Sequence, residues 1–157
     1  MKTGKSKVLK AAICILGIFL AFNVFWYIWR NVKYGSYING MKESEIPDWI
    51  VPRYYYVDDE GYDYSVKYPD YLSFTGNMSV GLPSADGNPF TDFLIIWPKL
   101  DGRYEYGVSL TVEGTNYQIM INDDGSAIDS KFSGIVASCK ETIDILLLKG
   151  DKMWHLE

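Results

Sequence analysis

An uncharged run at residues 11–29 is the feature that most constrains what this chain can fold into. Asn23 is the only strongly polar residue within it. Nineteen residues of α-helix span about 28 Å, which is close to the ~30 Å hydrocarbon core of a bilayer. The run therefore predicts a transmembrane anchor at residues 11–29.

Basic and aromatic residues flank this apolar run and predict its orientation. Four lysines precede it within residues 1–10, whereas Arg30 and Lys33 follow it closely. Because basic flanks tend to stay in the cytoplasm, we expect a cytoplasmic tail at residues 1–10 and a C-terminus outside the plasma membrane. The residues expected at the outer membrane interface are Trp26, Tyr27, Trp29 and Arg30.

A cleaved secretory signal and a buried helix of a soluble protein are the alternatives to an anchor. Signal cleavage requires small residues at the third and the first position before the cut. The best candidate is residues 21–23, but its last residue, Asn23, is not small. The apolar run also continues past this position. A lipoprotein signal requires a small residue before its cysteine, but Ile13 precedes Cys14. The sequence therefore favours an uncleaved, single-pass anchor.

The charge of the chain is divided unevenly along its length. The whole chain has a formal net charge of -5, but residues 1–30 hold four Lys, one Arg and no acid. Residues 31–157 therefore hold 10 of the 15 basic residues and all 20 acidic residues, a net charge of -10. Nucleic-acid phosphates bind to basic surfaces, so nucleic acid is not expected as a partner. Cys139 is the only cysteine beyond the apolar run, so no disulfide is expected within the exported part.

Composition divides the rest of the chain into a stalk and one domain. Glycine, proline and asparagine interrupt residues 30–53 and predict an irregular juxtamembrane stalk. Residues 54–157 are numerous enough for one compact domain. Because 48% of the chain is apolar, this part can bury a core, and we expect an extracytoplasmic domain at residues 54–157.

Four segments of this domain have the pattern of β-strands. Apolar and polar residues alternate over residues 72–80, 104–112 and 117–121, which is the period of a half-buried strand. Residues 93–97 are apolar on both faces, as in a central strand. The pair Asp101-Gly102 predicts a hairpin turn. Together these segments predict a four-stranded antiparallel meander.

A helical period follows the predicted strands. Apolar residues recur at steps of three and four over residues 128–147, which predicts one face of a helix. This helix is expected to start near Ser130 and to end near Gly150, either continuous or broken near Lys140. A strand at residues 142–148 is the alternative. One or two C-terminal helices on one face of the meander, after an N-terminal transmembrane helix, make an α+β fold.

A tyrosine-rich, acidic segment is the candidate binding surface. Tyrosine combines a large apolar area with a hydroxyl group at low entropic cost, so exposed clusters favour contacts with partners. The alternative is that these rings pack against the edge of the sheet. The candidate partner-binding residues are Tyr54, Tyr55, Tyr56, Tyr62, Tyr64 and Tyr68.

The sequence predicts no metal, cofactor or catalytic residue. Acidic residues cluster at 58–63 and at 122–129, but neither cluster has the spacing of an EF-hand loop. The single histidine, His155, lies close to the C-terminus, where a catalytic geometry is hard to hold. Cys139 lies on the predicted apolar helix face and is expected in the core.

These patterns favour a non-enzymatic interaction module anchored in the membrane. Its expected partners are the lipid bilayer and a protein that the sequence does not identify. Two other functions fit the composition. One is a cell-surface hydrolase acting on cell-wall material, and the other is a small protective protein that neutralises a basic toxin through its negative charge.

Overall fold

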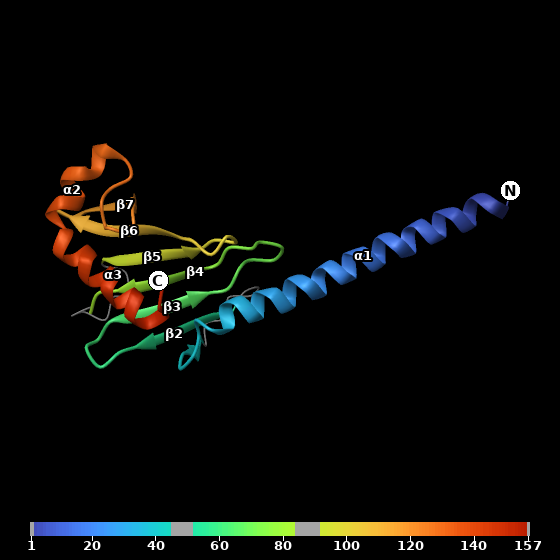
Figure 1. Ribbon diagram of the computed structural model, residues 1–157, viewed down its shortest axis with the longest axis horizontal. Coiled ribbons are helices and arrows are strands. Elements are labelled where there is room, and N and C mark those ends of the chain that lie inside the picture. Colours follow the sequence, from blue (N-terminus) through green and yellow to red (C-terminus); the bar gives the residue numbers. More distant parts are fainter. Residues whose placement is uncertain (1, 45–51, 84–91, 157) are drawn as a thin grey trace. The chain divides into compact units, whose positions relative to one another are not determined.

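The computed structural model describes residues 2–44, 52–83 and 92–156. The chain divides into two compact units, Met1–Ser36 and Tyr37–Glu157, and each is described by itself. The first unit is a helix and the second combines a sheet with short helices (Figure 1). This arrangement confirms the predicted α+β class.

The first unit is the single helix α1, Lys2–Gly35, which is long and apolar enough to cross a membrane. It continues six residues past the predicted end of the span, so the first part of the predicted stalk is helical. Within the helix, the Asn23 side-chain amide donates to the Phe19 carbonyl oxygen at 2.8 Å. This bond satisfies a polar group that would otherwise be costly in lipid.

Aromatic rings and basic side chains meet near the C-terminal end of α1. The Arg30 guanidinium lies 4.9 Å from the centre of the Trp26 ring and 5.2 Å from that of Tyr27. The Lys33 ammonium lies 5.5 Å from the centre of the Trp29 ring. These cation–π contacts join the residues predicted at the outer membrane interface.

The described residues of the second unit include one antiparallel sheet of seven strands, each hydrogen-bonded to its neighbours in chain order. The predicted number of four strands is therefore wrong. Strands β4 to β7 lie within or close to the four predicted segments, although β4 begins only at Asn77 rather than at residue 72. The strands are β1 Lys42–Glu43, β2 Arg53–Val57, β3 Asp63–Lys67, β4 Asn77–Gly81, β5 Phe93–Pro98, β6 Tyr104–Val112 and β7 Thr115–Ile121.

The three additional strands come from the predicted stalk and the acidic tyrosine-rich segment. In β2 and β3, every second residue faces the core side of the sheet, and Tyr54 pairs with Val66 while Tyr56 pairs with Tyr64. The turn between them includes Gly61, which has a left-handed φ of 86°. Acidic turn residues interrupt the apolar alternation here. The sequence pattern therefore did not predict β2 and β3 as a pair of strands.

Three short helices follow the sheet: η1 Ser130–Phe132, α2 Ser133–Ser138 and α3 Lys140–Trp154. Of the two predicted alternatives, the helix with a break near Lys140 is the one observed, since α2 and α3 meet at Cys139. The alternative strand at residues 142–148 is wrong. Asp129, rather than Ser130, caps the first turn by accepting the Lys131 N–H.

Gly150 does not end the helix as predicted but lies buried inside α3. A Cβ atom added there would lie 3.0 Å from Ile96 Cδ1 and 3.6 Å from Leu94 Cδ2. The missing side chain therefore allows α3 to approach the sheet closely. The helix ends four residues later, and His155 follows it with a left-handed φ of 52°.

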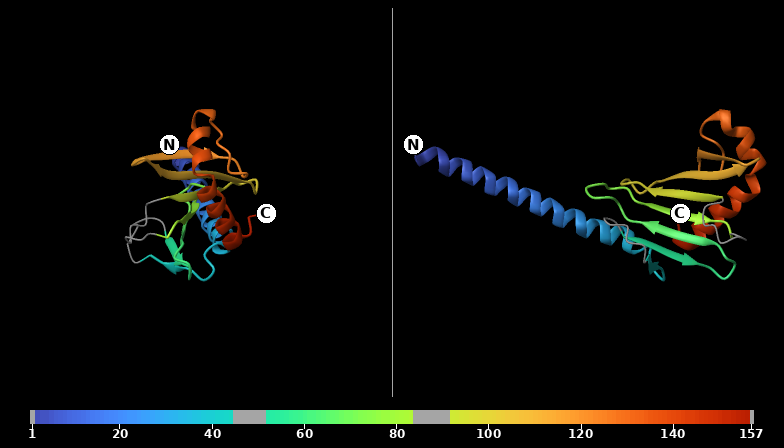
Figure 2. Two further views of the ribbon diagram at one scale, coloured as in Figure 1. Left: turned by 90° about the vertical axis from the view of Figure 1, so that its left-hand side faces the viewer. Right: turned by 180° about the vertical axis from the view of Figure 1, so that it is seen from behind.

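The hydrophobic core lies between α3 and one face of the sheet (Figure 2). Val80, Leu94 and Ile96 contribute the sheet side, while Ile143 and Leu146 contribute the helix side, and all five are inaccessible to solvent. Neither α2 nor α3 covers the opposite face. That face carries the half-buried residues Phe93, Ile95 and Trp97 along strand β5.

Candidate functional site

The predicted tyrosine cluster is divided between the core and the surface. Tyr64 and Tyr68 are buried, whereas Tyr55 and Tyr56 are exposed and Tyr54 and Tyr62 are half-buried. The rings of Tyr54 and Tyr68 lie 5.4 Å apart, and those of Tyr56 and Tyr64 lie 6.0 Å apart. Surface contact with a partner is therefore open mainly to Tyr55 and Tyr56.

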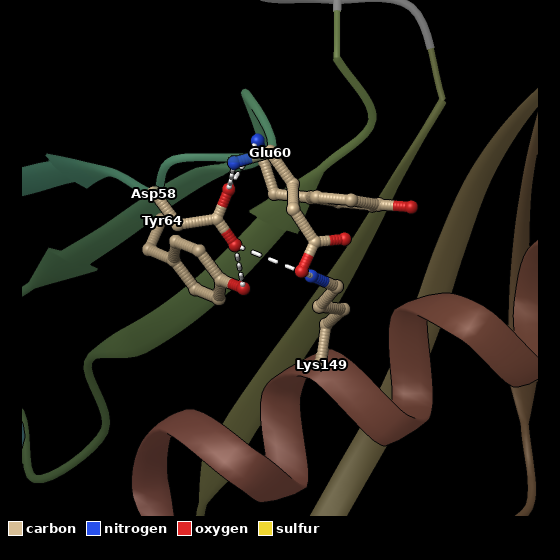
Figure 3. A network of polar contacts seen from close by, with 5 residues as sticks. Asp58, Glu60, Tyr64 and Lys149 are labelled. Atoms are coloured by element: carbon tan, nitrogen blue, oxygen red, sulfur yellow. Dashed lines mark hydrogen bonds and ion pairs between the residues drawn. The ribbon is translucent and has the colours of Figure 1, made fainter.

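A polar network joins the β2–β3 turn to α3 (Figure 3). Asp58 Oδ1 accepts the backbone N–H groups of Glu60 and Tyr62 at 3.0 and 2.9 Å. Its second oxygen, Oδ2, accepts the Tyr64 hydroxyl at 3.0 Å and the Lys149 ammonium at 3.3 Å. Lys149 also pairs with Glu60 at 2.9 Å and lies 4.1 Å from the centre of the Tyr62 ring.

The carboxylates of Asp58 and Glu60 and the ammonium of Lys149 stabilise one another in their charged forms. None of them is activated as a nucleophile or base. Burial alone would raise the pKa of Asp58, but hydrogen bonds from Tyr62, Tyr64 and Lys149 lower it overall. The hydrogen bond to Glu60 raises the pKa of Lys149, with Asp58 adding to the effect. Lysine acts as a nucleophile or base only when its pKa is lowered, so this cluster has the character of a structural ion pair.

Asp58→Asn is expected to destabilise the domain at neutral pH by about 1 kcal/mol, since it weakens hydrogen bonds to charged groups. The lowered pKa of Asp58 means that its contribution is present above the ordinary value of 3.8 and is lost as pH falls through the folded-state pKa. The difference between wild type and variant should therefore shrink below about pH 4. Urea unfolding of the full chain in detergent micelles at pH 7 and pH 3 measures this.

Asp59→Asn provides the matched control, because Asp59 is the exposed neighbour of Asp58. It should leave the unfolding midpoint nearly unchanged at both pH values. Equal midpoints for wild type and Asp58→Asn at pH 7 would show that the network does not hold the turn to the helix.

An acidic hollow of about 510 Å³ opens on the other side of α3, between this helix, β6 and the turn that follows β7. We call it the acidic pocket. Its lining residues are Tyr106, Asp123, Asp124, Asp144, Leu147, Leu148, Asp151 and Leu156. Leucine side chains thus form apolar walls beside four carboxylates.

The turn at residues 122–126 is held firmly against the helix. Asn122 Nδ2 donates to Ser126 Oγ at 2.8 Å, and the Ser126 N–H donates to Asp124 Oδ1 at 2.8 Å. A Cβ added at Gly125 would lie 3.1 Å from Ile143 Cγ2. This close packing fixes Asp123 and Asp124 opposite α3.

The acidic pocket carries more negative than positive charge. Lys140 pairs with Asp144, and its ammonium also donates to the Asp124 carbonyl oxygen at 3.0 Å. Among the described residues, neither Asp123 nor Asp151 forms an ion pair; Asp151 Oδ1 accepts the Leu156 N–H at 3.1 Å. Hydrogen bonds from the Ser126 side chain and N–H lower the pKa of Asp124, so it stays ionised at neutral pH.

Tyr106 supplies a neutral hydroxyl group to the acidic pocket. Burial raises its pKa, and the negative charges of Asp123 and Asp151 add to this rise. The hydroxyl therefore keeps its proton at neutral pH. Together, the carboxylates, hydroxyl and apolar walls suit a long cationic side chain, whose stem is apolar and whose end is charged.

Sequence reasoning found only part of this pocket. Asp123 and Asp124 belong to the acidic cluster at residues 122–129, which was considered as a metal site and set aside. Within the described residues, no group of three or more His, Cys, Asp or Glu side chains is arranged to hold a metal ion. The helix contribution could have been noticed, because Asp144 and Asp151 are two turns apart and so share one face.

No protein-family model matches the chain, and neither a curated protein nor a solved structure matches it. Inference about function therefore rests on the chain's own residues.

Proposed function

We propose that this chain is a single-pass membrane protein whose exterior domain binds a basic side chain of a protein partner in the acidic pocket. Helix α1 supports the anchor, since it is long and apolar enough to cross a membrane. Four lysines before the apolar run support a cytoplasmic N-terminus. The pocket is the observation that carries the binding function.

The pocket chemistry favours lysine or arginine as the inserted group. The apolar stem would pack on Leu147, Leu148 and Leu156, while the cationic end would approach Asp123 and Asp151. The negative charge of residues 31–157 would also steer a basic partner towards the domain, with an effect that falls as salt rises. A basic toxin is one partner of this kind, so neutralisation of a toxin would use the same pocket.

The acidic pocket supports binding better than hydrolysis. A glycosidase needs one carboxyl group with a raised pKa to protonate the leaving group. Burial raises the pKa of Asp63, but this residue lies on the opposite face of the sheet from α3. In the pocket itself, the pKa of Asp124 is lowered.

Binding can be tested with N-acetyl-arginine amide as a minimal basic probe. Titration of the isotope-labelled full chain in detergent micelles should shift the NMR signals of Tyr106, Leu147 and Leu148. Asp123→Asn/Asp151→Asn should weaken binding by about tenfold, since two nearby charges are lost. Added salt should weaken the wild-type interaction.

Asp59→Asn/Glu113→Gln is the matched control, because it removes two exposed negative charges outside the pocket. It should bind the probe nearly as wild type does. Equal losses in the two double variants would mean that overall charge, and not the pocket, attracts the probe. Unchanged pocket signals in the wild type would contradict the proposed site.

A further inference from the structure

Two turns of the exterior domain present apolar side chains to solvent. In the β3–β4 connection, Tyr71 is 51% exposed and Leu72 is 40% exposed, and in the β5–β6 turn Leu100 is 66% exposed. Turns are normally built from polar residues and glycine. Leu72 also has a left-handed φ of 59°, a conformation that is unfavourable for a leucine. Exposed apolar tips of this kind indicate a contact surface.

Both turns lie at the same end of the sheet. Lys67 at the end of β3 pairs with Asn77 at the start of β4, and Pro98 at the end of β5 pairs with Tyr104 at the start of β6. Because the four strands are adjacent and antiparallel, the two connections project from one edge of the domain. Figure 1 shows these connections at the same end of the sheet.

The chain enters the domain at this end. The hydroxyl oxygens of Tyr37 and Tyr104 lie 3.3 Å apart, and Tyr104 directly follows the β5–β6 turn. Tyr37 comes two residues after α1 ends at Gly35. From Arg30, at the predicted outer interface, to Tyr37 the chain advances about 10 Å if mostly helical. The headgroup layer on one side of a bilayer is about 5–8 Å thick.

The acidic side chains of these two turns do not oppose an approach to phosphate groups. Asp70 pairs with Lys67 at 3.1 Å, and Asp101 pairs with Arg103 at 2.6 Å. By contrast, the opposite end of the sheet carries the acidic β2–β3 turn with Asp58, Asp59 and Glu60. The β3–β4 and β5–β6 turns are thus better suited to a lipid surface than the β2–β3 turn is.

We propose that this end of the domain docks onto the phospholipid headgroups beside its own anchor, with Tyr71, Leu72 and Leu100 inserted into the interfacial layer. Apolar and aromatic side chains at this depth gain burial while their polar neighbours stay hydrated. The docking rests on the proposed anchor, because α1 in the membrane would keep the linked domain close to the headgroups.

Single-cysteine variants of the full chain test this docking. In a background with Cys14→Ser and Cys139→Ser, Leu72→Cys, Leu100→Cys and Leu148→Cys are each labelled with an environment-sensitive fluorophore. All three positions are exposed, so the label does not enter the core. The proteins are reconstituted into phosphatidylcholine–phosphatidylglycerol vesicles with and without headgroup-level spin-labelled lipid. Quenching at positions 72 and 100 should be at least about twofold stronger than at position 148, on α3.

Flotation of the same vesicles separates the two proposals. Every variant should float with the lipid, because Cys14→Ser is the only change within α1 and the rest of its apolar run is kept. Flotation with equal quenching at the three positions would overturn the docking and leave the anchor intact. Failure to float would contradict the anchor, and the docking with it.

Discussion

Leu146→Ala in α3 is expected to lower the free energy of unfolding of the α+β domain by about 2–5 kcal/mol. Leu146 is inaccessible to solvent on the helix face that packs against the sheet. The substitution removes apolar contacts and leaves a cavity that the surrounding strands can fill only in part. This loss is a large fraction of the total free energy of unfolding of a typical domain. The variant should therefore unfold at clearly lower urea concentrations than the wild type.

Leu148→Ala is the matched control, since Leu148 lies on the same helix but is 68% exposed. Its effect should stay within about 0.5 kcal/mol. Urea unfolding of the full chain in detergent micelles is followed by tryptophan fluorescence, to which Trp154 at the end of α3 contributes. Similar losses for both variants would contradict the packing of α3 on the sheet.

The register of α3 could be predicted because one helix face is apolar over several turns. The spacing of Ile143, Leu146 and Leu147 indicated a helix, and Ile143 and Leu146 are fully buried in the structure. The position of Gly150 was misjudged for a physical reason. Glycine commonly ends a helix, but here it allows close approach to Leu94 and Ile96, a tertiary effect that local sequence does not reveal.

The sheet was predicted only where alternation is long or the apolar run is continuous. Apolar and polar residues alternate over all nine residues of β6 and over residues 117–121 of β7, and β5 is apolar on both faces. Strands β2 and β3 have five residues each, and their tyrosines were interpreted as a surface cluster. Tyrosine fits both roles, so burial of Tyr64 could be decided only by its packing against Trp154, with ring centres 5.9 Å apart.

The contacts that join distant segments were beyond sequence reasoning. Asp58 and Lys149 are 91 residues apart and meet only because α3 crosses the sheet beside the β2–β3 turn. The acidic pocket likewise combines Asp123 from a turn with Asp151 from a helix. Taken alone, Asp123 is an ordinary turn residue and Asp151 is an ordinary solvent-facing position on a helix. Only the fold places them together.

The second large expected effect follows from the proposed anchor α1. Only the part of the chain after α1 should be accessible to reagents outside the cell. Four lysines within residues 1–10 outnumber the basic residues just beyond the apolar run. By the positive-inside rule we expect the N-terminus to stay in the cytoplasm and residues 31–157 to be exported. An anchored domain stays with its membrane, whereas a cleaved signal would release the domain without its first helix.

A membrane-impermeant maleimide applied to intact cells measures this topology directly. The full chain with Cys14→Ser and Cys139→Ser carries one new cysteine, either Ser6→Cys before the apolar run or Leu148→Cys on α3. Leu148→Cys should be labelled on intact cells and remain in the membrane fraction at full length, whereas Ser6→Cys should be labelled only after lysis. Labelling of Ser6→Cys from outside, or release of a domain shortened by about 20 residues, would contradict an uncleaved anchor with an exterior domain.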